Sequence, residues 1–210
     1  MNLISLGQRF ARLTTDIVVR RPRLWFLLRG PMRFQFDRLA PQWDSLRPSD
    51  TGYAPYEAAL EHVEPPPKRA LDLGTGTGGA AFAIARRFPH VEVIGVDLAK
   101  RMIELARGKL TDELRGRVRF EVADAAHLPY ADLSFDLVGL SNMIPFFDEL
   151  DRVLVPGGFL IFAFSGGAET PIYVPPERLR SELERRGFTD FAEFSTNPGT
   201  ALIARKPDDP

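Results

Sequence analysis

From Lys68 to the end of the chain, short apolar runs alternate with segments in which apolar residues recur every three or four positions. The short runs are rich in Val, Ile, Leu and Phe and predict strands at 69–73, 91–96, 117–122, 135–140 and 158–164. The helical spacing predicts helices at 78–88, 99–114, 146–154 and 175–186. Strands and helices that alternate in this way form a parallel sheet covered by helices on both faces, so we expect a doubly wound α/β fold.

The C-terminal end departs from this alternation. Two strand-like runs, 188–195 and 200–206, are separated only by Thr196-Asn197-Pro198-Gly199, a sequence typical of a turn. Such a short connection joins antiparallel strands. The sequence therefore predicts an antiparallel hairpin at the end of an otherwise parallel sheet.

The first 67 residues follow a third pattern. Their apolar residues recur at alternating spacings of three and four, which predicts one helical stripe made of Leu3, Leu6, Phe10, Leu13 and Ile17. Pro22 ends this helix, and the apolar run 24–28 follows before a break at Gly30-Pro31. We expect a second helical piece around 34–39 and a short helix at 53–63. Since Pro65-Pro66-Pro67 cannot continue a helix, we place a boundary there, between an N-terminal helical cap (1–67) and an α/β domain (68–210).

Charge is also distributed unevenly along the chain. Residues 1–35 hold seven arginines and a single acid, Asp16, for a net charge of +6, whereas the rest of the chain carries −7. The net charge of the whole chain is −1, so we expect no nucleic-acid partner. Without cysteine there is no disulfide or thiolate metal site, and no apolar run is long enough to span a bilayer. Arginines interrupt the N-terminus where a signal peptide would be apolar, and we expect a cytoplasmic protein.

The run Ala70-Leu71-Asp72-Leu73-Gly74-Thr75-Gly76-Thr77-Gly78-Gly79 carries the clearest chemical signal. It predicts a strand, a glycine-rich turn and a helix, an arrangement that brings a ligand against backbone amides and a helix N-terminus. Two acids follow the next strands, Asp97 after 91–96 and Asp124 after 117–122. In a doubly wound sheet, ligands bind at these carboxyl ends of the strands.

Read together with Ser134-Phe135-Asp136-Leu137-Val138 and Val155-Pro156-Gly157-Gly158, these motifs resemble class I S-adenosylmethionine-dependent methyltransferases of the small-molecule type, similar to those of quinone biosynthesis. The resemblance covers about residues 34–206 and implies a Rossmann-like, seven-stranded sheet whose last strand is antiparallel. It implies S-adenosylmethionine as the cofactor and a small molecule as the methyl acceptor.

The resemblance also assigns site residues. The predicted cofactor-binding residues are Asp72, Gly74, Thr75, Gly76, Gly78, Asp97, Leu98, Met102, Asp124, Ala125 and Ser141. Among them, Asp97 would accept hydrogen bonds from the ribose hydroxyls and Asp124 would accept one from the adenine amine. Phe36 and Trp43 lie in a segment like the one that closes over the cofactor in such enzymes, and Asn142 and Met143 follow strand four near the reactive methyl group. We interpret Asp136 as structural.

The sequence names no catalytic base and no metal site. None of His62, His90 and His127 has metal-ligand spacing, and the short segment 141–147 offers no carboxylate or histidine beside the acceptor. A general base is required only if the acceptor must lose a proton, so we expect catalysis mainly by positioning of the two reactants.

Two other functions stay open at this point. The glycine spacing also suits an NAD(P)-dependent oxidoreductase. A non-catalytic protein of the same fold could instead bind a partner through its basic arm. Residues 1–29 themselves have the composition of an interfacial helix, which would either contact anionic lipid or pack on the acidic remainder of the chain. The oligomeric state and the acceptor cannot be read from the sequence.

Overall fold

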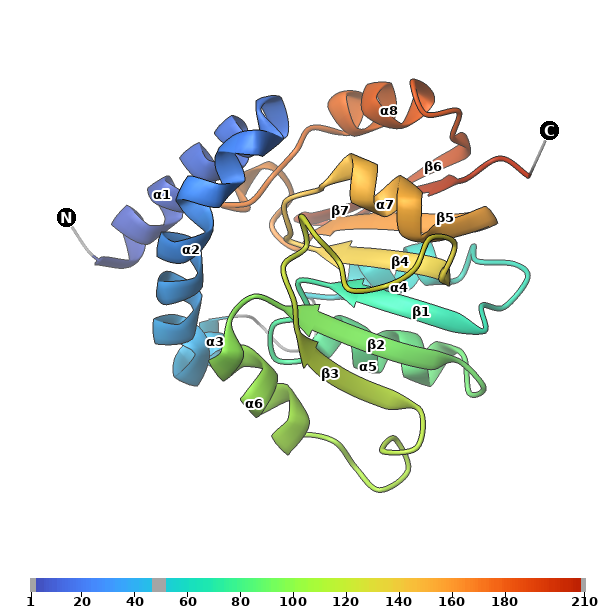
Figure 1. The fold of residues 1–210 in the computed structure, drawn as a ribbon, viewed down its shortest axis with the longest axis horizontal. Helices are drawn as coiled ribbons and strands as arrows, with labels where there is room; N and C mark the ends of the chain where they lie inside the picture. The colour runs from blue at the N-terminus through green and yellow to red at the C-terminus, as the bar shows by residue number, and fades with distance from the viewer. Residues whose placement is uncertain (1–2, 47–51, 209–210) are drawn as a thin grey trace.

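The computed structural model describes residues 3–46 and 52–208, of which 3–5 are described without their side chains. A seven-stranded sheet runs through the molecule in the order β3-β2-β1-β4-β5-β7-β6 (Figure 1). The strands are β1 (Arg69–Leu73), β2 (Glu92–Asp97), β3 (Val118–Val122), β4 (Phe135–Ser141), β5 (Leu154–Phe164), β6 (Thr189–Thr196) and β7 (Gly199–Arg205). The pairs β1–β2, β1–β4, β2–β3 and β4–β5 are parallel, whereas β7 is antiparallel to both β5 and β6. The predicted mixed sheet with its C-terminal hairpin is confirmed.

Helices lie on both faces and along one edge of this sheet. They are α1 (Leu3–Arg20), α2 (Trp25–Leu39), α3 (Trp43–Leu46), α4 (Ala54–Leu60), α5 (Gly79–Arg87), α6 (Lys100–Gly108), α7 (Phe147–Val153) and α8 (Pro176–Glu184). Short 3₁₀ turns are at Pro22–Leu24, Ala40–Gln42 and Gly167–Glu169. One apolar cluster joins α7, α8 and the N-terminal helices to the sheet, and another joins α4, α5 and part of α6 to its opposite face.

Some element boundaries differ from those expected. The helix predicted at 99–114 ends at Gly108, and the strand predicted to begin at 158 begins at Leu154. Gly157, with φ +74°, therefore lies inside an irregular strand start, where its amide donates to the carbonyl groups of Lys206 and Pro207. Backbone pairing with the end of the chain decides this boundary.

The expected break at Gly30-Pro31 is wrong, because α2 continues through both residues. A proline leaves the carbonyl group four residues earlier without its helical donor, here that of Leu27. Both Pro31 and Leu27 are exposed, so water can hydrogen-bond that carbonyl group and the helix tolerates the proline. Pro22 does end α1, as expected.

Helices α1 and α2 form a helical hairpin (residues 3–39) whose two arms meet where Gln35 Nε2 donates to the carbonyl oxygen of Gly7 at 3.1 Å. In Figure 1 the helical hairpin lies along the left side, next to the carboxyl ends of β1, β2 and β4. Arg12 ties it to the main body by donating to the carbonyl groups of Ala168 and Thr170 at 2.9 and 3.0 Å. The predicted helical cap thus covers the edge of the sheet where a ligand is expected.

The division of the chain at Pro65–Pro67 stays a prediction. Helix α4 comes before these prolines, and it packs against β5, β6 and β7 on one face of the sheet. Its Tyr56 and Leu60 are fully buried there. Residues 123–134, which connect β3 to β4, contain no helix, so the start of this connection is accessible to α2.

Candidate functional site

A cavity lies between the helical hairpin and the carboxyl ends of β1, β2 and β4. Eleven of the fifteen predicted site residues line it: Phe36, Trp43, Gly74, Gly76, Asp97, Leu98, Met102, Ala125, Ser141, Asn142 and Met143. The remaining four, Asp72, Thr75, Gly78 and Asp124, lie outside the lining. Residues spread over a hundred positions of sequence therefore meet in one place.

The turn after β1 brings its backbone to the cavity. Gly74 and Gly76 have φ values of +74° and +55°, a left-handed conformation that favours glycine. A Cβ atom on Gly74 would lie 2.6 Å from Met143 Sδ, and one on Gly76 would lie 3.1 Å from Trp43 Nε1. Met143 and Trp43 therefore lie against the two glycines in the cavity wall, and both were predicted to lie beside the ligand.

Asp72 and Thr75 hold this turn from inside the protein. Asp72 Oδ2 accepts hydrogen bonds from Thr75 Oγ1 at 2.6 Å and from the amide of Ala81 at 2.8 Å, in the first turn of α5. A carboxylate is favourable there because a helix N-terminus carries partial positive charge. Gly78 faces the rings of Phe82 and Phe120, not the cavity. These residues shape the turn, and their predicted contact with a ligand stays a prediction.

Asp97 lies at the end of β2 and joins that strand to the glycine turn. Its Oδ2 accepts from the amide of Gly76 at 2.9 Å, and its Oδ1 accepts from the amide of Ala99 at 2.8 Å. Burial raises the pKa of Asp97 to about 6, although the amide hydrogen bonds oppose the shift, and the Asp37 carboxylate in α2 adds to it. A carboxylate with such a pKa is ionised at neutral pH and becomes protonated under mildly acidic conditions.

Asp124 is bound by the helical hairpin. Trp25 Nε1 donates to Asp124 Oδ1 at 2.7 Å, and Arg29 pairs with Oδ2 at 3.2 Å. The amide of Ala126 donates to Oδ1 at 3.0 Å. The acid predicted to accept from an adenine amine therefore already has donors from α2, while its neighbour Ala125 reaches the cavity.

The residues after β4 form the wall expected near the acceptor. Ser141 is buried, and its hydroxyl group has no hydrogen-bond partner among the described residues. Asn142, with φ +53°, is fixed to the end of β5: its Nδ2 donates to Ser165 Oγ at 2.8 Å, and its Oδ1 accepts from the amide of Ser165 at 2.9 Å. A buried hydroxyl group without a partner is unfavourable unless a ligand supplies one.

Sequence reasoning did not identify several residues of the wall. The cavity is also lined by Trp25, Met32, Arg33, Leu73, Val96, Ala99, Ala123, Ile144 and Ile172. Met32 and Phe36 are four positions apart on α2, a spacing that places them on one side of a helix but does not say which side faces the sheet. Ile172 follows β5 in a segment without a recognisable motif. Trp25 lies in the apolar run 24–28, which carries no recognisable motif.

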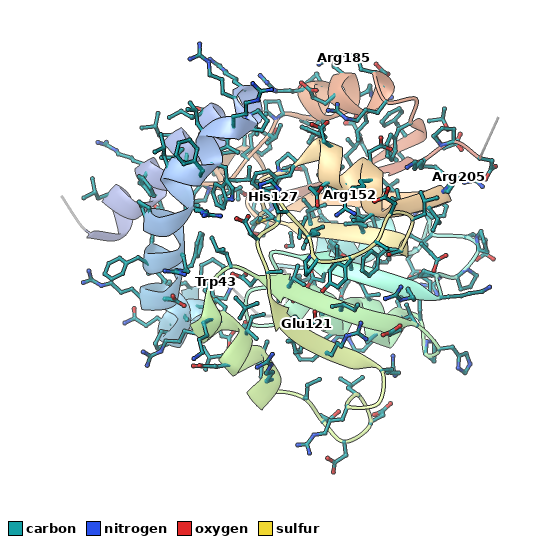
Figure 2. The ribbon with its side chains drawn as sticks, viewed as in Figure 1. Trp43, Glu121, His127, Arg152, Arg185 and Arg205 are labelled. Atoms are coloured by element: carbon teal, nitrogen blue, oxygen red, sulfur yellow. The ribbon has the colours of Figure 1, made fainter. Side chains whose placement is uncertain are left out.

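The cavity is closed by the helical hairpin. Its volume is about 60 Å³, well below the roughly 300 Å³ at which pockets for drug-sized ligands begin. Trp43 lies between the helical hairpin and the ends of the strands (Figure 2), and the neighbouring Asp44 accepts from Thr77 Oγ1 at 2.6 Å. The glycine turn, Asp97 and the buried Ser141 hydroxyl group suit a nucleoside cofactor with a polar tail, provided that Trp43 and Met143 move away.

A second, larger cavity of about 660 Å³ lies on the other side of Trp25. Its walls come from the turn of the helical hairpin and from the start of α7, and they include Val19, Arg20, Arg23, Trp25, Phe26, Phe146, Phe147 and Glu149. The rings of Trp25 and Phe146 meet edge to face at 5.3 Å. Trp25 thus forms part of the wall of both cavities.

His127 lies in the second cavity, between the helical hairpin and α7 (Figure 2). Over residues 3–46 and 52–208, no group of three or more His, Cys, Asp or Glu side chains is arranged to hold a metal ion. Asp136 accepts from the amides of Lys68 and Arg69 at 3.0 and 2.7 Å, at the end of the sheet away from the cavity.

Comparison with known proteins identifies methyltransferases as the proteins that this chain resembles. Residues 70–158 match the family model described as a methyltransferase domain. The chain is 38% identical over 138 residues to a demethylmenaquinone methyltransferase of Deinococcus radiodurans, covering 60% of this chain and 56% of that protein. It is 36% identical over 118 residues to a malonyl-[acyl-carrier protein] O-methyltransferase of Methylococcus capsulatus, covering 53% of this chain and 42% of that protein.

The fold is also shared with solved structures. One is a protein of Methanococcus maripaludis described as a candidate S-adenosyl-L-methionine-dependent methyltransferase, with a TM-score of 0.65 and 21% identity. The match covers 83% of this chain and 94% of that one. At that identity the likeness concerns the fold alone. The chain spans about half the length of the curated relatives it matches.

Proposed function

Because this chain carries a class I S-adenosylmethionine-dependent methyltransferase domain, we propose that it transfers the methyl group of that cofactor to a small, apolar acceptor. The observation that carries the proposal is the convergence of the glycine turn, Asp97 and the buried Ser141 hydroxyl group on one cavity. The cofactor supplies a methyl group on a positively charged sulfur atom, so the carbon is already activated toward a nucleophile. The protein mainly has to hold the two reactants in line and exclude water.

Different residues of the chain would bind different parts of the cofactor. The backbone at Gly74 and Gly76 lies where it can approach a ligand once Met143 and Trp43 have moved. Asp97 faces the same cavity and can accept hydrogen bonds from a ribose diol, since each of its oxygens has a further lone pair. Asp124 can accept from an adenine amine only after Trp25 gives up its hydrogen bond.

The second cavity suits the acceptor. Its volume of about 660 Å³ falls in the range of pockets for drug-sized molecules. Four aromatic residues contribute to its wall, Trp25, Phe26, Phe146 and Phe147, and aromatic rings favour a flat or apolar body. Trp25 belongs to the walls of both cavities, so a shift of Trp25 would also bring donor and acceptor together.

The names of the relatives support a class of acceptor, a small molecule or a carrier-bound acyl group, but no single compound. The two relatives above are named for chemically different acceptors, demethylmenaquinone and malonyl-[acyl-carrier protein]. The aromatic rings of the second cavity favour a ring compound, and the four arginines of the same wall, Arg20, Arg23, Arg29 and Arg186, suit a polar or acidic substituent on it.

Segment 141–147 offers no carboxylate or imidazole, whereas His127 and Glu149 line the second cavity. Positioning carries the reaction for an acceptor that ionises by itself, and these two side chains are the candidate bases for an acceptor that must lose a proton.

Calorimetric titration of the full chain with S-adenosylhomocysteine and, separately, with NAD tests the cofactor. Binding of the first and not the second is expected, and the reverse result would assign the chain to the nicotinamide oxidoreductases. Transfer of labelled methyl groups from S-adenosylmethionine to naphthoquinols, or to a metabolite extract, tests the reaction. Cofactor binding without any transfer would instead indicate a non-catalytic cofactor-fold protein.

Ser141→Ala should weaken cofactor or acceptor binding without unfolding the protein, since its hydroxyl group has no partner among the described residues.

A further inference from the structure

The side of the helical hairpin that faces away from the sheet is unusually apolar. Of the nine large apolar side chains that are well exposed in the described part of the chain, six lie within residues 6–46. Five of these belong to α1 and α2 and are between 50% and 69% exposed: Leu6, Leu13, Phe26, Leu27 and Phe34. We call these five residues the hairpin face.

Helical geometry explains why these residues lie together. Leu6 and Leu13 are seven positions apart, as are Leu27 and Phe34, and a separation of seven returns a side chain to the same side of a helix. The other side of each helix is buried in the main apolar cluster through Ala11 and Val18 on α1 and Trp25 and Met32 on α2. The hairpin face is therefore exposed to solvent, and in Figure 1 α1 and α2 form the outermost layer on the left side of the molecule.

The charges around the hairpin face are almost all positive. The helical hairpin carries eight arginines against the two acids Asp16 and Asp37; the arginines are Arg9, Arg12, Arg20, Arg21, Arg23, Arg29, Arg33 and Arg38. Arg20 and Arg23 are exposed and make no hydrogen bond or ion pair within the described structure. Exposed Leu and Phe side chains beside free guanidinium groups are typical of a helix that lies in the interface of an anionic membrane.

We propose that the hairpin face docks on an anionic lipid surface. None of the described helices is long and apolar enough to cross a bilayer, so the contact would be peripheral. A second copy of the chain fits less well, because two such faces would bring like charges together. Docking on the chain's own acidic body is already excluded for these side chains, since they are exposed while the opposite side of each helix makes that contact.

The position of the hairpin face connects it to the site. Phe26 belongs to the hairpin face and also lines the second cavity, as do the neighbouring Arg20 and Arg23. A docked protein would therefore present the entrance of that cavity to the lipid, where apolar molecules partition. This step rests on the proposed function, whereas the docking itself does not.

Vesicle flotation of the full chain tests the docking. Vesicles of phosphatidylglycerol and phosphatidylcholine in equal parts are compared with vesicles of phosphatidylcholine alone, at low and at physiological salt. The protein is expected to float with the anionic vesicles and not with the neutral ones. Each of Arg20→Gln and Arg23→Gln should weaken binding about fivefold, as expected for one arginine at an anionic surface. Leu13→Gln and Phe34→Gln should weaken it further.

Matched controls separate the hairpin face from the rest of the surface. Leu105→Gln removes an exposed leucine from α6, and Arg115→Gln removes an exposed arginine, both outside the helical hairpin. These two variants should float like the unchanged protein. Calorimetry with S-adenosylhomocysteine on each variant reports the cofactor site independently, so a failure of the methyl-transfer proposal leaves the flotation result interpretable.

Absence of flotation with anionic vesicles at low salt would overturn the proposal. Equal loss of binding in the Leu105→Gln and Arg115→Gln controls would overturn it as well, and so would binding that Leu13→Gln and Phe34→Gln leave unchanged. A dimer in light scattering that Leu13→Gln and Phe34→Gln dissociate, without flotation, would assign the hairpin face to a second copy.

Discussion

The indole Nε1 of Trp25 donates a hydrogen bond to Oδ1 of Asp124 over 2.7 Å, across 99 positions of sequence. Arg29 pairs with the other oxygen of the same carboxylate at 3.2 Å. Asp124 is the acid that the family resemblance assigns to the adenine amine, so the helical hairpin bonds to a predicted cofactor contact. We infer that cofactor binding and release of Trp25 are coupled, since the two sets of donors compete for one carboxylate.

Trp25→Phe tests this coupling. The substitution keeps an aromatic ring but removes the donor to Asp124, and a hydrogen bond to a charged group contributes about 1.5–3 kcal/mol. The closed arrangement should lose stability, and the affinity for S-adenosylhomocysteine should rise about tenfold, as 1.4 kcal/mol implies. Calorimetry measures the affinity, and thermal unfolding measures the loss of stability of the free protein.

Tyr130→Phe is the matched control for that variant. It removes the hydrogen bond from Tyr130 to Glu121, 2.9 Å long and away from the helical hairpin. It should lower the melting temperature without changing the affinity. If Trp25→Phe folds and binds the ligand no more tightly than the unchanged protein, the competition does not exist.

Cofactor affinity should depend on pH through Asp97. The ionised carboxylate can accept from two ribose hydroxyl groups, whereas its protonated form has lost part of that capacity. Since the pKa of Asp97 in the free protein is raised to about 6, affinity should be constant at neutral pH and should fall below pH 6. The slope should approach about tenfold per pH unit.

Substitutions at Asp97 separate this effect from other titrating groups. Calorimetry across about pH 5 to 7.5 should show the fall in the unchanged protein and a flat, weaker profile in Asp97→Asn. Asp97→Ala should lose roughly 1.5–3 kcal/mol of binding free energy at neutral pH. A folded Asp97→Ala variant with unchanged affinity would remove the ribose assignment.

Gly76 should tolerate no side chain. Its φ of +55° is unfavourable for other residues by about 1–2 kcal/mol, and a Cβ atom would lie 3.1 Å from Trp43 Nε1. Gly76→Ala should therefore reduce both stability and cofactor binding, and Gly76→Val should abolish binding. Gly108→Ala is the control, because nothing lies within 4 Å of a Cβ atom built there. It should leave binding intact, and normal binding by Gly76→Val would show that the turn is not the site.

Trp43 should report the opening of the cofactor cavity. The chain has two tryptophans, so Trp25→Phe leaves Trp43 as the single indole fluorophore. Its emission should change when S-adenosylhomocysteine is added, because the ligand must displace it from Gly76. Tryptic cleavage at Arg33 and Arg38 should be suppressed by the same ligand. Equal emission and equal cleavage with and without ligand would favour a purely structural role for Trp43.

Thr77→Val tests whether the contact between Thr77 and Asp44 keeps Trp43 over the cofactor cavity. The variant keeps the shape of the buried residue but removes the hydroxyl group that donates to Asp44 at 2.6 Å. Association of S-adenosylhomocysteine in stopped-flow fluorescence should become at least about fivefold faster, corresponding to a loss of ~1 kcal/mol of hydrogen-bond energy. An unchanged rate would mean that opening does not break this contact.

The sequence by itself determined the features that depend on local physics. The alternation of apolar runs and helical spacings is fixed by side-chain period, and it predicted the parallel strands and the final antiparallel pair. The positive φ values of Gly74 and Gly76 follow from a turn that few other residues can adopt. Acids placed after strands could likewise be located in advance, because carboxyl ends of parallel strands share one edge.

Tertiary structure alone decided what depends on contacts between distant segments. The stripe of α1 was visible in the sequence, but packing against the rest of the protein buries Ala11 and Val18 and leaves Leu6 and Leu13 exposed. The sequence could not indicate that Asp124 binds Trp25, nor that α2 continues through Gly30-Pro31. Each outcome is set by packing of the helical hairpin against the sheet, where the gain from burial and hydrogen bonding between remote residues exceeds local preference.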